Sequence, residues 1–279
     1  MLFAAVATDQ GQRPHMEDTY VVDRVLRLVG VFDGHGGSQV AEYCAQHAPH
    51  HVRAALLGGG GRASLSPRSS GAFAAETEAA LATEPERIQR ALVEAFLTMD
   101  AAAERDVNVS NVGCTACVAI CGQNDVWVAN AGDSRAILCI DGAVTPLSRD
   151  HKPELPDERS RILSNGGRVI YDGHGSHRIN GTLNVSRGIG DWYLRHMVVP
   201  TPEVVRVRRP KEATFKRAFL VIASDGLWDV FGSAELGRYM NAALDGGATV
   251  QQAIEAAVRD AGLRGSTDNI TVAYVSVFR

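Results

Sequence analysis

The positions of apolar residues along the chain predict short strands interleaved with helices. Short runs rich in Val, Leu and Ile, bounded by Gly, Asp and Asn, are typical of strands. Such runs occur at residues 2–8, 19–32, 113–121, 125–131, 134–140, 203–208, 218–224 and 270–277. Apolar residues spaced three or four positions apart predict helices, and they occur at residues 38–57, 88–103, 153–164, 233–245 and 249–262. Hairpin-linked strands combined with helix pairs predict an α+β fold in which helices cover antiparallel sheets.

Two stretches interrupt this pattern. Residues 58–71 are rich in Gly and Ser, and we interpret them as a flexible loop inserted between two helices. Residues 166–186 contain short strand-like runs broken by glycines, and we predict a mobile flap there. Neither stretch marks a change in composition, so we expect a single domain over residues 1–279.

Composition restricts the classes of function. The chain has 279 residues, is 45% hydrophobic and 22% charged, and carries a formal charge of -4. This acidic balance predicts no general affinity for nucleic acid or for anionic membranes. An acidic protein that handles phosphate needs cations to hold it. No apolar run approaches the length of a membrane span, and we interpret residues 1–7 as part of a first strand, not as a signal peptide.

The cysteines indicate a reducing compartment. Five cysteines is an odd number in a chain of this length, which favours free thiols. Cys114 and Cys117 have the spacing of half a zinc ribbon, but no second pair exists, and on a strand their sulfurs point to opposite faces. With no targeting segment visible, we expect a cytoplasmic location, a nuclear one, or both.

One stretch stands out for its chemistry. Val31-Phe32-Asp33-Gly34-His35-Gly36-Gly37 carries a carboxylate off the end of an apolar run and into a turn of small residues. A carboxylate, a bare backbone carbonyl and a histidine within three positions suit a hard cation with a proton donor beside it. Taken alone, an Asp-Gly turn after a strand is a common structural feature.

Four further acidic clusters sit beside strands in a similar way. They contain Glu17 and Asp18, then Asp133, then Asp225 and Asp229, and lastly Asp268. Each one alone is more typical of a turn or a surface ion pair. Together, carboxylates at strand ends provide the oxygen ligands that two small divalent cations require. Two such cations can activate a hydroxide and stabilise an in-line phosphoryl displacement.

At this point the motifs form a familiar series. In chain order they are Arg13-x-x-Met16-Glu17-Asp18, Asp33-Gly34-His35-Gly36-Gly37, Gly132-Asp133-Ser134-Arg135, Ser186-Arg187-x-x-Gly190-Asp191, Asp225-Gly226-x-Trp228-Asp229 and Asp268-Asn269. The chain resembles the metal-dependent protein serine/threonine phosphatases of type 2C over essentially its whole length. The resemblance implies a four-layer α-β-β-α sandwich, with two central antiparallel sheets flanked by pairs of helices.

The resemblance also implies the metal ligands. Asp33 is expected to bridge two Mn²⁺ or Mg²⁺ ions, and Glu17 and the backbone carbonyl of Gly34 to complete one of them. Asp225 and Asp268 are expected to hold the other ion.

The remaining roles follow from the same motifs. Asp18 is expected to act through bound water, and Asp133 with Asp229 to form a third, weaker metal site. Arg13 is expected to bind the substrate phosphate with its planar fork. His35 is expected to act as general acid toward the leaving seryl or threonyl oxygen, because its unperturbed pKa of about 6.5 suits proton donation near neutral pH.

We therefore expect a protein serine/threonine phosphatase that hydrolyses phosphoprotein substrates by means of a metal-activated hydroxide. Two alternatives remain: an inactive scaffold on the same fold, and another two-metal phosphoester hydrolase, such as a nuclease. A scaffold has no need of mutually repelling carboxylates. One arginine expected to bind phosphate, Arg13, in a chain of acidic balance does not make a nucleic-acid groove. We expect neither nucleic acid nor a membrane as partner, and we expect a monomer, although no sequence feature decides the oligomeric state.

Overall fold

The computed structural model of the protein describes residues 3–58, 85–209 and 215–277. The inserted loop expected at residues 58–71 lies, apart from its first residue, outside the described residues. Within them, two five-stranded antiparallel sheets form the centre of the molecule. The expected α+β class is therefore confirmed.

The first sheet joins the two ends of the described chain. Its order is β1 (Phe3–Asp9), β15 (Ile270–Ser276), β14 (Ala218–Ala223), β8 (Arg135–Ile140) and β9 (Ala143–Pro146). The second sheet has the order β13 (Glu203–Arg208), β7 (Asp125–Ala131), β6 (Ala116–Cys121), β3 (Leu28–Phe32) and β2 (Thr19–Asp23). Every pairing in both sheets is antiparallel.

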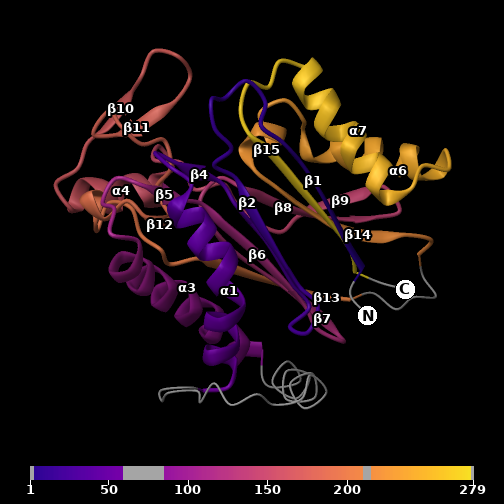
Figure 1. The fold of residues 1–279 in the computed structure, drawn as a ribbon, viewed down its shortest axis with the longest axis horizontal. Helices are drawn as coiled ribbons and strands as arrows, with labels where there is room; N and C mark the ends of the chain where they lie inside the picture. The colour runs from indigo at the N-terminus through magenta and orange to yellow at the C-terminus, as the bar shows by residue number, and fades with distance from the viewer. Residues whose placement is uncertain (1–2, 59–84, 210–214, 278–279) are drawn as a thin grey trace.

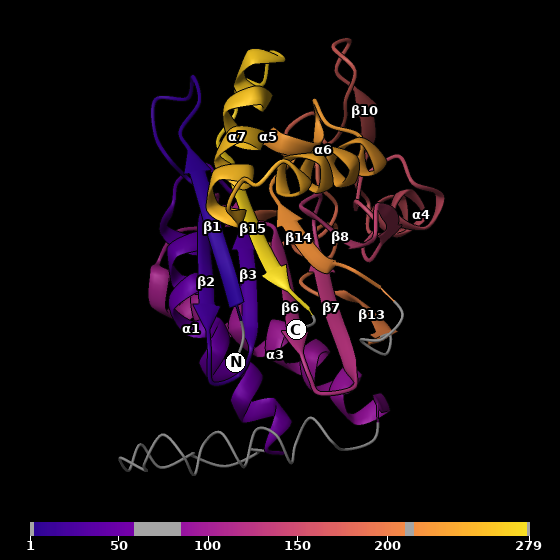
Figure 2. The ribbon, with the colours of Figure 1, turned by 90° about the vertical axis from the view of Figure 1, so that its right-hand side faces the viewer.

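Helices cover the outer face of each sheet. Helices α1 (Gln39–Leu56) and α3 (Pro85–Val107) pack on the second sheet, and α6 (Ser233–Asp245) and α7 (Val250–Leu263) pack on the first. Figure 1 shows the two sheets stacked between these helix pairs, and Figure 2 shows the same layers after a quarter turn.

The strand sequences explain this layering. All five residues of β3 are buried, because one face of the strand meets helices and the other meets the opposite sheet. Leu28 and Phe32 pack with α1 and α3, whereas Val29 and Val31 pack between the sheets. Because successive side chains of a strand point to opposite faces, this one apolar run contributes to two cores, one under the helices and one between the sheets.

Shorter elements complete the end of the sandwich where the acidic motifs lie. A short helix, α5 (Asp225–Trp228), follows β14 and packs against β15 of the first sheet. A three-stranded sheet has the order β12 (Ile189–Gly190), β5 (Gly113–Cys114) and β4 (Gly34–His35), and another short helix, η1 (Trp192–Leu194), follows β12. Beyond it, α4 (Pro156–Ser164) and the hairpin β10 (Val169–Tyr171) and β11 (His177–Ile179) project from the body (Figure 1).

Three local predictions need correction. The strand expected over residues 113–121 is broken at Thr115, whose N–H donates to the Asp33 carbonyl at 2.9 Å. The helix expected from residue 153 begins at Pro156, because proline has no N–H to bond and its fixed φ suits the first helical position. Ser38 has a helical backbone conformation, and its hydroxyl makes no capping hydrogen bond to α1.

The prediction that the sulfurs of Cys114 and Cys117 face opposite sides is confirmed. Cys114 packs in the core under α1 and α3, and Cys117 packs in the core between the sheets, so the two sulfurs face opposite sides. Among the described helices, none is long and apolar enough to cross a bilayer.

Candidate active site

Most of the predicted site residues line one cleft of about 560 Å³ at the end of the sandwich. The lining includes Arg13, Glu17, Asp33, Gly34, His35, Asp133, Asp225 and Asp268. Two predicted residues, Asp18 and Asp229, lie near this cleft without lining it. The antiparallel order of the sheets explains the gathering, because it brings strand ends and turns from distant parts of the sequence to one edge.

Three carboxylates form the centre of the cleft. Oxygen atoms of Asp33, Asp133 and Asp225 all lie within 4.8 Å of one another. Burial raises the pKa of Asp33 and of Asp225 well above the ordinary value, and the negative charges of the neighbouring carboxylates raise it further. Such a set is unfavourable without positive charge between its members, and its oxygen ligands fit a hard divalent cation.

Asp18 lies behind this cluster and is almost fully buried. Its Oδ2 accepts a hydrogen bond from the Ser224 hydroxyl at 2.7 Å, whereas its buried Oδ1 has no hydrogen-bond partner among the described residues. Burial raises the pKa of Asp18 to about 6. An unpaired buried carboxylate oxygen is costly, and a water molecule on a nearby cation would satisfy it.

Two basic side chains approach the carboxylates. Lys152, from the loop before α4, donates a hydrogen bond to Oδ2 of Asp133. Nη2 of Arg13 donates to Oδ2 of Asp268 at 2.5 Å. The sequence interpretation had not assigned Lys152 to the site, because nothing in its local sequence indicates that it reaches a turn 19 residues earlier.

Asp229 occupies a different position from the central cluster. It is the C-terminal cap of α5, one turn after Asp225, and its side chain is exposed. Asp225 and Asp229 lie one helical turn apart, since the Asp229 N–H donates to the Asp225 carbonyl at 2.8 Å.

Gly34 allows a close approach between two backbone segments. A Cβ atom at this position would lie 2.4 Å from the carbonyl oxygen of Glu17, so no side chain fits. The Glu17 N–H in turn donates to Oδ1 of Asn269 at 2.7 Å. Asn269 also donates to the carbonyls of Gln10 and His15, as expected for a residue that orients loops.

His35 is paired with Asp191. Its Nε2 lies 2.6 Å from Oδ2 of Asp191, which is 1% exposed. Burial alone would lower the pKa of His35, but the hydrogen bond and charge of Asp191 outweigh burial and raise it. The contact requires Gly113, where a Cβ atom would lie 2.1 Å from Oδ2 of Asp191. Asp191 belongs to one of the sequence motifs, but nothing in that motif indicated its pairing with His35.

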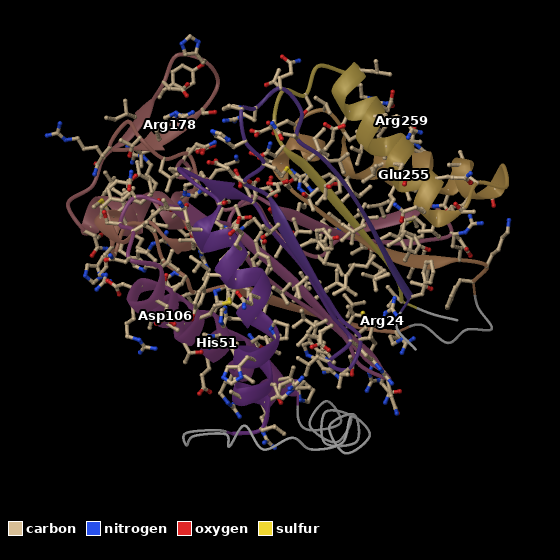
Figure 3. All side chains as sticks on the ribbon, in the orientation of Figure 1. Arg24, His51, Asp106, Arg178, Glu255 and Arg259 are labelled. Atoms are coloured by element: carbon tan, nitrogen blue, oxygen red, sulfur yellow. The ribbon has the colours of Figure 1, made fainter. Side chains whose placement is uncertain are left out.

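The far wall of the cleft comes from the predicted flap region. Arg178, Thr182, Leu183, Asn184 and Val185 of this region contribute to the lining, as does Tyr193 of η1. Nε of Arg178 donates to Oδ2 of Asp172 at 3.0 Å, and Figure 3 places Arg178 at the base of the hairpin. His174 and His177, which belong to the same region, do not contribute to the lining.

The sandwich and its cleft together define an α+β protein with a site suited to divalent cations. Comparison with known proteins then gives the family. The model of the protein phosphatase 2C family matches residues 10–270. The chain therefore belongs to the protein phosphatase 2C family.

Individual relatives agree with this assignment. A rice protein named probable protein phosphatase 2C 8 (Oryza sativa subsp. japonica) is 39% identical over 271 residues, which cover 89% of this chain and 62% of the rice protein. Protein phosphatase 1L of Bos taurus is 34% identical over 97% of this chain and 71% of the bovine protein. The crystal structure of a serine-threonine phosphatase 2C from Toxoplasma gondii superposes with a TM-score of 0.80 at 25% identity, covering 98% of this chain and 94% of that one.

Proposed function

We propose that the protein hydrolyses phosphoserine and phosphothreonine in protein substrates at a site for two divalent cations. The observation that carries this proposal is the carboxylate cluster of Asp33, Asp133 and Asp225 within 4.8 Å, in one cleft with Arg13 and His35. Membership of a family of protein phosphatases supports the substrate class.

The residues that line the cleft support the ligand set expected from the sequence motifs. Asp33, Glu17, the Gly34 carbonyl, Asp225 and Asp268 would together hold the two ions. When bound, Mn²⁺ or Mg²⁺ supplies positive charge to the transferring phosphoryl group and lowers the pKa of bound water.

The more distant carboxylates have secondary roles. Asp18 would accept a hydrogen bond from metal-bound water at its unpaired Oδ1. Asp133, together with Asp229, would hold a third, weaker ion.

Arg13 binds the substrate phosphate. It lines the cleft, its side chain is 55% exposed, and its guanidinium already lies against the carboxylate of Asp268. A planar fork of N–H donors matches two phosphate oxygens at once. Arg13 therefore holds the phosphoryl group directly beside the proposed metal ligands.

His35 donates the proton that the leaving oxygen needs. Because a carboxylate can only accept, Nε2 of His35 donates to Asp191 and Nδ1 is left to face the substrate. The raised pKa of His35 favours the protonated form, which is the form required of a general acid.

The test is hydrolysis of a phosphothreonine peptide with Mn²⁺ or Mg²⁺, and with EDTA, by the wild type and by Asp225→Ala. We expect metal-dependent release of phosphate from the wild type and loss of release in the variant. Metal binding without turnover would instead support an inactive scaffold. Turnover of small phosphoesters or nucleic acid without turnover of phosphopeptides would support another kind of hydrolase.

A further inference from the structure

Asp100 lies on α3, outside the lining of the cleft, and binds the backbone of Gly190 and the side chain of Trp192, on either side of Asp191. Its Oδ1 accepts a hydrogen bond from the Gly190 N–H at 2.9 Å and another from the indole Nε1–H of Trp192 at 3.1 Å. Gly190 and Trp192 are the two neighbours of Asp191. One oxygen atom of α3 therefore connects to both residues that flank the carboxylate paired with His35.

The backbone at this point needs such support. Gly190 has a φ of +94° and Asp191 a φ of +51°, a left-handed conformation that is uncommon for a residue with a side chain. The Asp191 N–H donates to the Val112 carbonyl at 3.0 Å, which fixes the segment from the side of β5. Asp100 fixes it from the side of α3, so the left-handed turn is held between two partners.

An ion pair or a hydrogen bond between a helix and a loop usually has a purely structural role, so the contacts of Asp100 need a comparison. Glu104 provides the comparison, because it lies one turn further along the same helix and pairs with Arg195. That pair is exposed, with side-chain exposures of 41% and 52%, and it reaches no neighbour of Asp191. Only Asp100 among these contacts acts on the residues next to Asp191.

We propose that Asp100 is a positioning residue for the general-acid step, holding Asp191 so that its carboxylate orients His35. This inference rests on the proposed function. In the step concerned, the O–P bond breaks and its electron pair stays on the seryl or threonyl oxygen, which takes the proton of His35. Water adds to phosphorus, and the proton that it loses restores the imidazolium.

The test compares two substrates that differ in their need for that proton. A phosphothreonine peptide has a poor alkoxide leaving group, whereas p-nitrophenyl phosphate releases a stable phenolate without protonation. For Asp100→Ala we expect kcat on the peptide to fall about tenfold, and kcat on the aryl phosphate to stay within about twofold. Asp100→Asn retains an acceptor oxygen for both donors and is expected to restore most of the peptide activity.

Two control variants make the outcome decisive. His35→Ala, measured on both substrates, gives the full size of the general-acid effect. Glu104→Ala removes a neighbouring contact of α3 that does not involve Gly190 or Trp192. If His35→Ala loses activity equally on both substrates, the general-acid role itself fails. If His35→Ala discriminates between the substrates and Asp100→Ala does not, the positioning role of Asp100 is overturned.

A second variant covers the case in which Asp100→Ala does not fold. Trp192→Phe keeps the aromatic ring and removes one of the two donors. We expect about a threefold loss confined to the peptide substrate. The inference would be contradicted if Trp192→Phe folds and its ratio of kcat on the peptide to kcat on the aryl phosphate equals that of the wild type, while Glu104→Ala is fully active.

Discussion

The guanidinium of Arg13 and the carboxylate of Asp268 come from opposite ends of the chain, yet Nη2 lies 2.5 Å from Oδ2. The contact joins the residue proposed to bind phosphate to a residue proposed to bind a cation. It depends on the pairing of β1 with β15, which places the segments after Asp9 and before Ile270 side by side. The proposed phosphate and cation sites are therefore adjacent because β1 and β15 pair in the first sheet.

Arg13 is expected to bind the substrate phosphate through two N–H donors of its guanidinium group. For Arg13→Ala we expect kcat/KM on a phosphothreonine peptide to fall about 100-fold, since charge-assisted hydrogen bonds contribute about 1.5–3 kcal/mol. Arg13→Lys should recover only part of this, because an ammonium cannot bind two phosphate oxygens as a planar fork. Arg24→Ala, an exposed arginine in the β2–β3 turn, is the matched control (Figure 3). Equal kcat/KM for the Arg13→Ala and wild-type enzymes would show that another residue binds the phosphate.

The carboxylate cluster should destabilise the protein in the absence of metal. Burial and the neighbouring carboxylates raise the pKa of Asp225, so its charged form is unfavourable at neutral pH in the native state. Asp225→Asn is therefore expected to raise the Tm of EDTA-treated protein by about 2–4 °C. The same variant should lose the rise in Tm that Mn²⁺ gives the wild type. Calorimetry with and without Mn²⁺ measures both effects, and the exposed Asp245→Asn serves as control.

If the EDTA-treated Asp225→Asn protein were less stable than the wild type, the charges would already be compensated without metal. An unchanged response to Mn²⁺ would place the cations away from Asp225.

Gly113 is expected to tolerate no side chain, because a Cβ atom would lie 2.8 Å from Nε2 of His35 and closer still to Asp191. Gly113→Ala should therefore separate His35 from Asp191 and lower kcat on a phosphothreonine peptide by about tenfold or more. Gly262→Ala on α7 is the control, since nothing lies within 4 Å of the added atom and alanine favours helix. A Gly113→Ala enzyme with wild-type kcat would show that the contact is dispensable.

Glu158 should make the stability depend on acid pH. Its side chain is fully buried between Arg161 and Arg187, with oxygen to nitrogen distances of 2.7 and 2.6 Å. Burial opposes its charge, but these arginines and the Ser186 hydroxyl outweigh burial and lower the pKa to about 2 from the ordinary 4.5. A lowered pKa stabilises the fold above pH 4.5, and that contribution, on the order of 3 kcal/mol, is lost as the pH falls toward 2.

The measurement is the free energy of unfolding by urea between pH 3 and 6 for the wild type and Glu158→Gln. The difference between the two proteins should be largest at pH 6 and should shrink below pH 4.5. A difference that stays constant with pH would mean that packing, and not the carboxylate charge, makes Glu158 important.

Local sequence determined much of the secondary structure. The strands at 125–131 and 203–208 and the helix at 233–245 have the bounds that their apolar patterns predict. These patterns reflect burial of one or two faces of an element, which depends on residues close together in the chain. The types of residue at the site were also evident, because carboxylates directly after apolar strands are local features.

Only the tertiary structure decided which of those residues meet. Asp33, Asp133 and Asp225 are far apart in the sequence, and the fold brings their carboxylates together. His35 meets Asp191 across 156 positions because β5 pairs with both β4 and β12. Such contacts depend on strand register and on loop paths between distant segments. No local period encodes these, and so the sequence supplied the chemical groups while the packing of the two sheets fixed their partners.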